Sequence, residues 1–501
     1  MFKIFQGIHL VDHYHNQKKA RRESKVVSRT IKLLICIAAL LVLWFLPTEI
    51  YGIPGLSTVE HRVIAIFIFT TLMWILEGVP SWTTSVLATT LLMFTCSDQT
   101  LLPLRDASFL PTEEGAKFAA NIIKSKDLFA TFADPIIMLF LGGFFLAIAA
   151  TKTGLDVKLA RIMLYPFGKK SENVLLGFIL VTGIFSMFMS NTATAAMMLA
   201  FLTPVLKSLP ADGKGRVALA LAIPIGANVG GMGTPIGTPP NAIALKYLQD
   251  ELNISISFGE WMGVMLPYVL VVLFLSWIVL RFMFPFKQKE IEIKIEDTAK
   301  GSKHLTIVCV TYVVTILMWI CEKYTGIGSN AVAMVPITVF VLTGVIGRRD
   351  LEEVNWSVLW MVAGGFSLGV ALQQTGLAKH MVEHIPFGEW PALLMIVGAG
   401  LLCWMLSNII SNTATANLLV PILAIIGVSA KDALAPYGGV HALLVGVAMC
   451  ASLAMLLPIS TPPNALAHST GLVEQKDMMR VGLIVGLGGI VLGYLMLFFV
   501  Y

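Results

Sequence analysis

The sequence has few charged residues, few cysteines and no cluster of catalytic or metal-ligating side chains. Only 13% of its 501 residues are Asp, Glu, Lys or Arg, about half the fraction found in soluble globular proteins. Its six cysteines are scattered, with no Cys-x-x-Cys pair, which argues against a disulfide framework or a metal centre. No His, Asp or Glu cluster is evident at midplane depth, which disfavours an intramembrane enzyme. No basic patch with interleaved aromatic residues suggests a nucleic-acid partner.

Hydrophobic residues, by contrast, make up 56% of the chain and occur in continuous runs. A helix crosses a bilayer with about 20 apolar residues, whereas a membrane β-barrel would show alternating patterns. The sequence therefore predicts an all-α polytopic membrane protein in a lipid bilayer. The net charge of +5 comes largely from the N-terminus and the loops, so it reports orientation in the membrane.

The apolar pattern predicts eleven spans and two re-entrant hairpins. The spans lie near residues 33–46, 60–79, 81–97, 131–150, from 216 (broken at 230–240), 259–283, 304–321, 329–347, 356–373, 437–468 (also broken) and 481–500. The hairpins occupy residues 173–206 and 390–427. Basic residues before the first span place the N-terminus in the cytoplasm, and the count then places the C-terminus outside.

Two polar phrases occur twice within the apolar sequence. Ser-Asn-Thr-Ala-Thr-Ala stands at 190–195 and 411–416, and Thr-Pro-Pro-Asn-Ala stands at 238–242 and 461–465. With paired Gly-Gly-Phe and Thr-Gly-Leu landmarks upstream, the copies are separated by 222, 222, 221 and 223 residues. An odd number of spans between equivalent residues gives the two halves opposite orientations in the membrane. Such an inverted-topology repeat is typical of secondary transporters, which bind substrate and ions at the repeat interface.

The four phrases predict helix breaks at membrane depth. Residues 230–240 hold more Gly and Pro than a regular helix accommodates, and the Ser-Asn-Thr phrases suit the hairpin tips. Thr238 and Thr461 suit N-cap positions, with the prolines in the first turn. Up to four helix N-termini would then favour an anion, while carbonyl, Ser and Asn oxygens suit Na⁺. Small-residue helix packing is the alternative, disfavoured because the tracts repeat in register.

At these residues the sequence resembles the divalent anion/sodium symporter family of Na⁺-dependent di- and tricarboxylate transporters. The match comprises both phrase pairs and the segment 132–144, FADPIIMLFLGGF, and it covers nearly the whole chain after the first thirty residues. The resemblance implies a homodimer in the bacterial inner membrane that works as an elevator, with Na⁺ as the coupling ion and no other cofactor. It divides the chain into a cytoplasmic tail (1–30), a scaffold (31–170 and 304–388), a transport domain (171–283 and 389–501) and a cytoplasmic linker (284–303).

Matched residue by residue, the family motifs imply two Na⁺ sites and one substrate site. The first Na⁺ site comprises Ser186, Ser190, Asn191 and the backbone of Gly237. The second comprises Ser407, the backbone of Ile410, Asn412 and the backbone of Ser460. The dicarboxylate would lie between Asn191, Thr192, Asn412 and Thr413, closed by Pro239, Thr461 and Pro462.

The implied function is Na⁺-coupled symport of C4-dicarboxylates such as succinate, malate and fumarate. The sequence leaves open a Na⁺-independent dicarboxylate exchanger and a citrate or sulfate carrier of the same fold. An ion channel fits poorly, because two hairpins entering from opposite sides suit alternating access.

Overall fold

The computed structural model describes residues 27–51, 53, 55–105, 121–207, 209–210, 213–291, 303–384 and 389–501. Most of the predicted tail (1–30) and of the predicted linker (284–303) lies outside these ranges. Within them the chain is helical, and strand-like pairing is limited to two isolated bridges, Ser97–Ile123 and Lys170–Glu290. The prediction of an all-α protein is confirmed.

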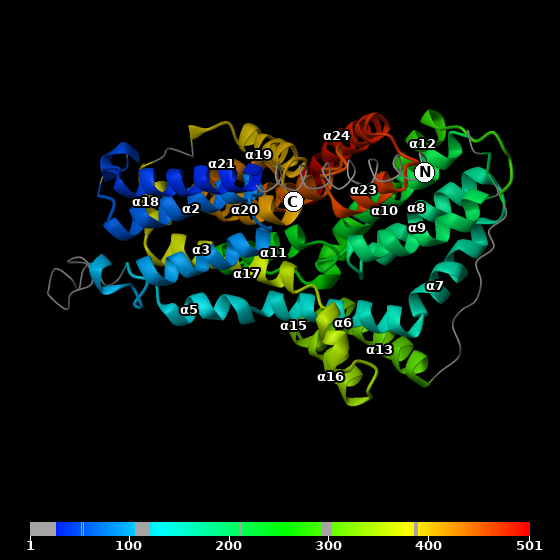
Figure 1. Cartoon of the computed structure of the whole chain (residues 1–501), viewed down its shortest axis with the longest axis horizontal. Helices are drawn as coiled ribbons and strands as arrows, with labels where there is room; N and C mark the ends of the chain where they lie inside the picture. Colours follow the sequence, from blue (N-terminus) through cyan, green and yellow to red (C-terminus); the bar gives the residue numbers. More distant parts are fainter. Residues whose placement is uncertain are drawn as a thin grey trace, which may run out of the picture. The chain divides into compact units, whose positions relative to one another are not determined.

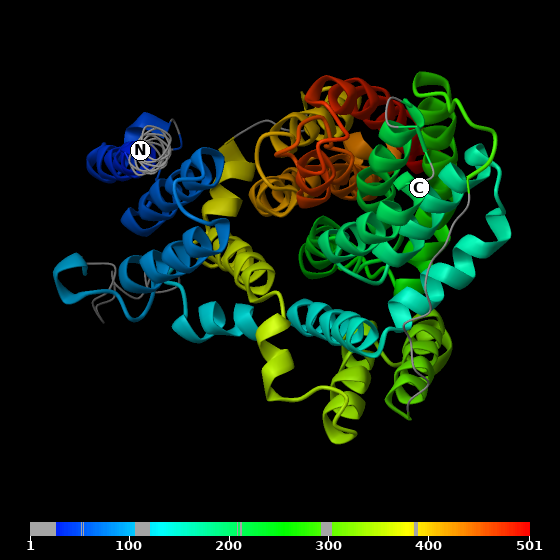
Figure 2. The same ribbon diagram turned by 45° about the vertical axis from the view of Figure 1, so that its right-hand side comes forward.

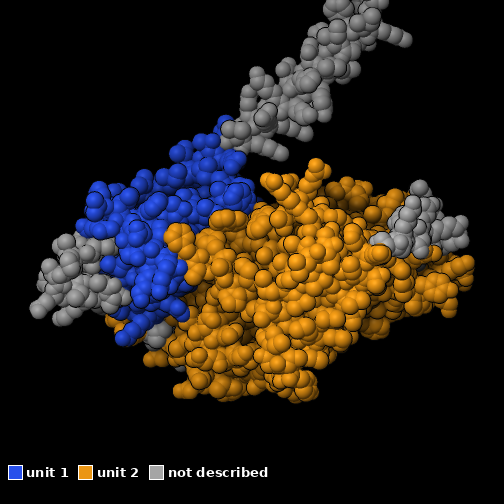
Figure 3. Space-filling view, turned by 90° about the horizontal axis from the view of Figure 1, so that it is seen from below, with its two compact units in different colours: residues 1–128, 367–381 blue, residues 129–366, 382–501 orange. Residues whose placement is uncertain are grey.

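The chain forms two compact units, residues 1–128 with 367–381 and residues 129–366 with 382–501 (Figure 3). Unit 1 contains the helix Val27–Phe45 and the helices α2 (Thr58–Leu76) and α3 (Ser81–Cys96). Three helices cross the boundaries between the units: α5 (Ser125–Ala130), α17 (Trp356–Gln374) and α18 (Leu377–His384). The predicted scaffold and transport domains are a different division, and they stay a prediction.

Unit 2 holds both repeated phrase pairs. Its first repeat contains α6 (Pro135–Thr153), α7 (Leu155–Leu164), α8 (Ser171–Ser186), α9 (Asn191–Lys207), α10 (Gly215–Gly230), α11 (Pro239–Leu252) and α12 (Phe258–Met283). The remaining helices are α13 (Lys303–Ile320), α14 (Glu322–Thr325), α15 (Ser329–Val332), α16 (Met334–Leu342), α19 (Ala392–Ser407), α20 (Asn412–Ser429), α21 (Lys431–Leu434), α22 (Gly439–Ser452), α23 (Pro462–Ser469) and α24 (Gln475–Val500).

Nine helices of the described residues are long and apolar enough to cross a membrane, or ten with the bent pair Lys431–Tyr437 and Gly439–Ser452. The predicted spans 81–97 and 329–347 form shorter helices, α3 and α15–α16. Conversely α20, predicted as the return arm of a hairpin, is long enough to count as a span. Apolar helices of this number and length are those of an integral membrane protein, while the count of eleven spans stays a prediction.

All four predicted helix breaks are present. The phrase at 190–195 starts in the break between α8 and α9 and continues into the first turns of α9, and its copy does the same between α19 and α20. Thr238 and Thr461 are the N-caps of α11 and α23, each of which begins with two prolines. Proline is tolerated in a first turn because that turn leaves its amides unpaired. The predicted N-caps are therefore confirmed.

The two repeats exchange their short half-helices. Helix α11 of the first repeat packs on α20 and α22 of the second, and α23 of the second packs on α9 and α10 of the first. In Figure 1 the orange-red α23 lies beside the green α10, and Figure 2 shows the orange helices of the second repeat next to the green helices of the first. This exchange brings all four breaks to one place.

Helix α6 packs on α13, α15 and α16 and is tied at both ends by ion pairs. At its N-terminus, the N-cap Asp134 pairs with Lys246 of α11, and both side chains are largely buried. At its C-terminus, Lys152 lies 2.6 Å from a carboxylate oxygen of Asp350. There the Gly347 amide and the Lys152 ammonium lower the pKa of Asp350 below its usual value.

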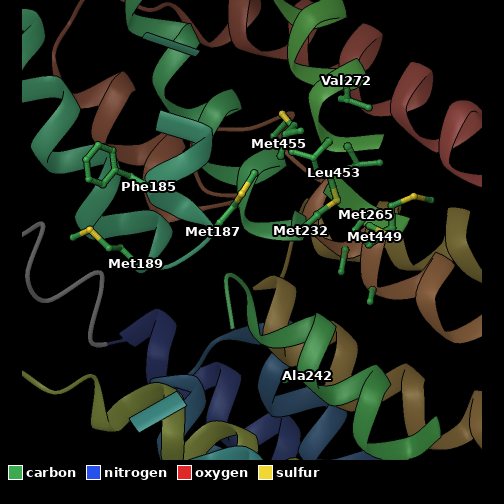
Figure 4. Close-up of a cluster of buried hydrophobic side chains, with 14 of the residues drawn as sticks. Phe185, Met187, Met189, Met232, Ala242, Met265, Val272, Met449, Leu453 and Met455 are labelled. Carbon is green, nitrogen blue, oxygen red and sulfur yellow. The ribbon is translucent and has the colours of Figure 1, made fainter. Parts of the chain in front are cut away.

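Methionine side chains fill the core beside the breaks. Figure 4 shows Met187, Met232, Met265, Met449 and Met455 among the buried side chains of this cluster. All five are buried, and Met232 and Met455 occupy equivalent positions in the two repeats. Unbranched, flexible methionine fits irregular spaces well, so its enrichment here follows from the non-helical backbone that it packs against.

Close packing of α8 on α10 gives a test of this fold. A Cβ added at Gly230 would overlap the backbone carbonyl of Gly183, and overpacking of a rigid core costs about 1–3 kcal/mol. We expect Gly230→Ala to lower the melting temperature of the purified protein in detergent. The matched control is Gly488→Ala in α24, where an added Cβ meets nothing within 4 Å. Equal melting temperatures for the two variants would contradict so close an approach of α8 to α10.

Candidate functional site

One cavity of about 230 Å³ lies where the four breaks meet, entirely within unit 2. Its wall includes all seven residues predicted for the substrate: Asn191, Thr192, Pro239, Asn412, Thr413, Thr461 and Pro462. Asn191 and Asn412 are also predicted for Na⁺, and three further residues of the Na⁺ set line the cavity: Ser190, Gly237 and Ser460. Ser186, Ser407 and Ile410 do not line it and are buried. The structure thus brings the predicted residues together, and their roles stay a prediction.

Four helices begin at this cavity. Its lining includes Asn191, Pro239, Asn412 and Pro462, the first residues of α9, α11, α20 and α23. Unpaired backbone amides at the starts of α9 and α20, together with the helix dipoles, make these ends favourable for an anion. Helices α11 and α23 contribute their dipoles only, because each begins with two prolines, which have no amide hydrogen. None of the described residues in the lining carries a charge. The cavity therefore offers positive potential from the backbone alone.

In the first repeat, three oxygen atoms converge behind the cavity wall. The Ser186 hydroxyl lies 2.6 Å from Oδ1 of Asn191 and 2.8 Å from the carbonyl oxygen of Ala227. A hydroxyl has one proton and can donate to only one of these acceptors at a time. A Cβ at Gly231 would lie 2.8 Å from Asn191 Oδ1 and 3.1 Å from the Gly237 carbonyl, so Asn191 and that carbonyl face the same point. This cluster of uncharged oxygens suits a hard cation.

The second repeat builds the same cluster. The Ser407 hydroxyl lies 2.8 Å from Oδ1 of Asn412 and 3.1 Å from the carbonyl oxygen of Ala451. Ser186 and Ser407 are both fully buried, and each stands five residues before its asparagine. The geometry is therefore reproduced twice, as the repeat predicts.

Two other residues predicted for Na⁺ use their side chains to hold the backbone. The Ser190 hydroxyl accepts a hydrogen bond from the Ala193 amide at 3.2 Å and so caps α9. The Ser460 hydroxyl donates to the carbonyl of Asn408 at 2.9 Å and accepts from the Leu457 amide at 3.0 Å. Ser460 thus fixes the second break against the tip of its hairpin.

Sequence reasoning missed the residues that brace the breaks. The side-chain amide of Asn241 donates through Nδ2 to the backbone carbonyls of Gly231 and Thr234 at 3.1 and 2.8 Å. Its repeat partner Asn464 donates to the carbonyls of Met455 and Leu457 at 2.9 and 3.0 Å. Both asparagines belong to the repeated Thr-Pro-Pro-Asn phrase, so the sequence signal was present but carried no indication of this role.

Broken helices from two sequence repeats, gathered around a small uncharged cavity, are the arrangement expected of a transporter. Residues 71–438 match the family model described as "Citrate transporter". The chain belongs to this family of transporters and is not an enzyme, and the resemblance to the divalent anion/sodium symporters is confirmed.

Two named relatives are similar to this chain over most of its length. It is 30% identical to the sodium-dependent dicarboxylate transporter SdcS of Staphylococcus saprophyticus, covering 91% of this chain and 89% of that protein. It is also 30% identical to SdcS of Staphylococcus aureus strain USA300, covering 87% and 85%.

Two solved structures share the fold at low sequence identity. The YdaH transporter of Alcanivorax borkumensis has a TM-score of 0.55 at 12% identity, covering 87% of this chain and 98% of that one. MtrF of Neisseria gonorrhoeae has a TM-score of 0.52 at 12% identity, covering 89% and 96%. Both are transporters, and at this identity the likeness concerns the fold alone.

Bracing by Asn241 can be tested through stability. Removing its amide leaves buried carbonyls without a donor, which costs about 1–3 kcal/mol, so we expect Asn241→Ala to lower the melting temperature clearly. Asn330→Ala is the matched control, because Asn330 is half-buried in α15 and makes no side-chain hydrogen bond to a described residue. If the two variants melt together, Asn241 does not brace the break.

Proposed function

We propose that this protein imports C4-dicarboxylates such as succinate, malate and fumarate by Na⁺-coupled symport. The observation that carries the proposal is the pair of equivalent Ser-Asn-carbonyl clusters, Ser186-Asn191-Ala227 and Ser407-Asn412-Ala451, beside one uncharged cavity. The names of the relatives, sodium-dependent dicarboxylate transporters, support both the ion and the substrate class.

Electrostatic magnitudes favour cation coupling. A helix N-terminus contributes about 0.3–2 kcal/mol towards binding an anion. A Na⁺ about 4 Å from a carboxylate contributes about 4 kcal/mol at an effective dielectric constant of about 20. One bound cation at that distance therefore contributes more than any one helix end, which favours holding a dianion with cations bound beside the cavity.

In the proposed mechanism, two Na⁺ ions bind first and fix the hairpin tips. Asn191 and Asn412 then contribute to both the ion sites and the substrate site. Each Oδ1 belongs to an oxygen cluster proposed to bind Na⁺, and each residue also lines the cavity. The amides of Thr192 and Thr413, with the N-caps Thr238 and Thr461, receive the two carboxylates. Since the substrate completes a site that the ions organise, the carrier loaded with only one of them is disfavoured.

The shape of the cavity supports a short dicarboxylate. Apolar side chains line it between the polar tips, among them Phe140, Phe144 and Val358. They suit a short hydrocarbon segment between two charged ends. A volume of about 230 Å³ is below the range of about 300–1,000 Å³ typical of drug-sized ligands. Citrate or sulfate transport and Na⁺-independent exchange remain the alternatives that the first experiment distinguishes.

That experiment is uptake of labelled succinate into proteoliposomes under an inward Na⁺ gradient, against an equal K⁺ gradient, with empty or succinate-loaded lumens. We expect uptake into empty vesicles with Na⁺ only. Uptake confined to loaded vesicles and indifferent to Na⁺ would make the protein an exchanger. No uptake of succinate would turn the search to citrate and sulfate.

Variants of the two clusters sharpen this test. Hydrogen bonds and contacts to charged groups are worth about 1.5–3 kcal/mol, so Ser186→Ala and Ser407→Ala should each raise the Na⁺ concentration for half-maximal uptake about tenfold or more. Ser276→Ala is the control, because that buried hydroxyl only donates to its own helix, at Val272. Unchanged Na⁺ dependence in both cluster variants would refute the assigned ion sites.

The elevator mechanism, the homodimer, the inner-membrane location and the cytoplasmic N-terminus with the C-terminus outside belong to the same proposal. The ion pair of Asp134 with Lys246 supports the elevator, because it joins α6 of the predicted scaffold to α11 of the predicted transport domain. If α11 travels past α6, this pair must separate in every cycle.

A cross-link tests that movement. We expect Asp134→Cys with Lys246→Cys, joined by a short bis-methanethiosulfonate cross-linker, to bind Na⁺ but stop transporting, and to recover when a reductant cuts the two disulfides. Cys309 and Cys321 should first be replaced by alanine, because they are the half-buried cysteines and the other four are buried. The double-cysteine variant without the cross-linker is the control. Full transport by cross-linked protein would exclude a sliding of α11 along α6.

A further inference from the structure

Asn228 is a buried amide that reaches from the first repeat into the second. It lies near the end of α10, lines the cavity and is 1% exposed. Its Nδ2 lies 3.1 Å from Oγ1 of Thr461, the N-cap of α23, and 3.3 Å from Oδ1 of Asn464 in the first turn of that helix. Its own Oδ1 has no hydrogen-bond partner among the described residues. A buried amide with an unsatisfied acceptor is costly, so the residue calls for a role.

The orientation of this amide is fixed by its partner. Asn464 uses its Nδ2 for the carbonyls of Met455 and Leu457, which leaves its Oδ1 as an acceptor only. Asn228 must therefore direct Nδ2, and not Oδ1, towards Asn464. The same Nδ2 then donates to Thr461 as well.

The consequence falls on the hydroxyl of Thr461. Its oxygen accepts one hydrogen bond from Asn228 Nδ2 and a second from the backbone N–H of Asn464, at 3.3 Å. A hydroxyl accepts two hydrogen bonds and donates one, so both lone pairs are engaged. Its proton has no acceptor among the described residues, and Thr461 lines the cavity. The hydroxyl can only donate, and the direction left to it is the cavity.

The start of α11, in the first repeat, lacks the arrangement found at the start of α23. Judged by contacts, Ser452 holds the place of Asn228, because Ala227 and Ala451 occupy equivalent places in the two oxygen clusters. The copies are 224 residues apart here and 223 residues apart from Met232 onwards. The Ser452 hydroxyl bonds the Ala448 carbonyl of its own helix. Thr238, the counterpart of Thr461, makes no capping hydrogen bond, and Oδ1 of Asn241 has no partner within the described part of the chain. The two ends of the cavity are therefore chemically unequal.

We propose that Asn228 is a positioning residue that turns the Thr461 hydroxyl into an obligate donor to one carboxylate of the substrate. Thr238, at the other end, keeps a hydroxyl that can donate or accept. This inference rests on the proposed function, because it assigns a carboxylate to the cavity. Asn228 acts on the substrate only through Thr461.

The test is a pair of double-mutant cycles on succinate uptake in proteoliposomes. We expect Asn228→Ala to raise the KM for succinate about tenfold while changing the maximal rate less than about twofold, as loss of one oriented hydrogen bond predicts. In a Thr461→Val background the same substitution should add less than about twofold. In a Thr238→Val background it should keep its full effect.

Two controls separate positioning from general damage. Ser452→Ala should keep the KM within about twofold, because its hydroxyl serves only its own helix. Stabilisation of the Asn228→Ala protein by Na⁺ without dicarboxylate, measured by thermal shift, should match that of the unmodified protein. If Asn228→Ala does not fold, Asn228→Leu removes the same hydrogen bonds at nearly constant volume and enters the same cycles.

The outcomes distinguish this inference from the proposed function. If the unmodified protein shows no Na⁺-dependent succinate uptake, the proposed function fails whatever Asn228 does. If it transports but Asn228→Ala leaves the KM unchanged, the inference is overturned. Equal effects of Asn228→Ala in the Thr461→Val and Thr238→Val backgrounds, or loss of Na⁺ stabilisation, would also overturn it, because Asn228 would then act on the structure as a whole.

Discussion

Non-helical backbone at membrane depth is the constraint on which the rest of this structure depends. Each unpaired amide or carbonyl in an apolar medium costs several kcal/mol, and this chain interrupts helices at four places. Asn241 and Asn464 satisfy carbonyls of the two Gly- and Pro-containing breaks. Thr234 and Ser460 tie those breaks to the carbonyls of Met187 and Asn408 at the hairpin tips. The first residues of α9, α11, α20 and α23 all line the cavity, where a ligand can reach these helix ends.

The sequence was sufficient for much of this arrangement because breaks leave strong local signals. Paired prolines after threonine predicted where α11 and α23 begin, and Ser-Asn-Thr predicted where α9 and α20 begin. Both signals act within one helical turn and need no knowledge of tertiary structure. The near-constant spacing of the copies then predicted that residues as distant as Asn191 and Asn412 would meet, and both line the cavity.

Span counts and partner choice were beyond the sequence for a physical reason. Helices α3 and α16 are apolar but short, so length alone does not decide whether they cross. The partners of Asn228 lie more than two hundred residues away, and Ser452, which holds the matching place beside the second oxygen cluster, bonds only its own helix. A polar residue that breaks the internal symmetry gives no repeated pattern, and only the packing of α23 on α10 reveals what it touches.

Departures from symmetry are informative because the repeat supplies its own reference. Where both halves carry the same residue in the same contact, as with Ser186 and Ser407, the shared geometry reflects a need common to both sides. Where they differ, the two sides perform different tasks. Lys246 has Ser469 at the equivalent position, so the tie to Asp134 exists in one repeat only. An alternating carrier whose two halves were identical would have equal free energy facing either way, so under the proposed mechanism such one-sided contacts are where the two states would differ in free energy.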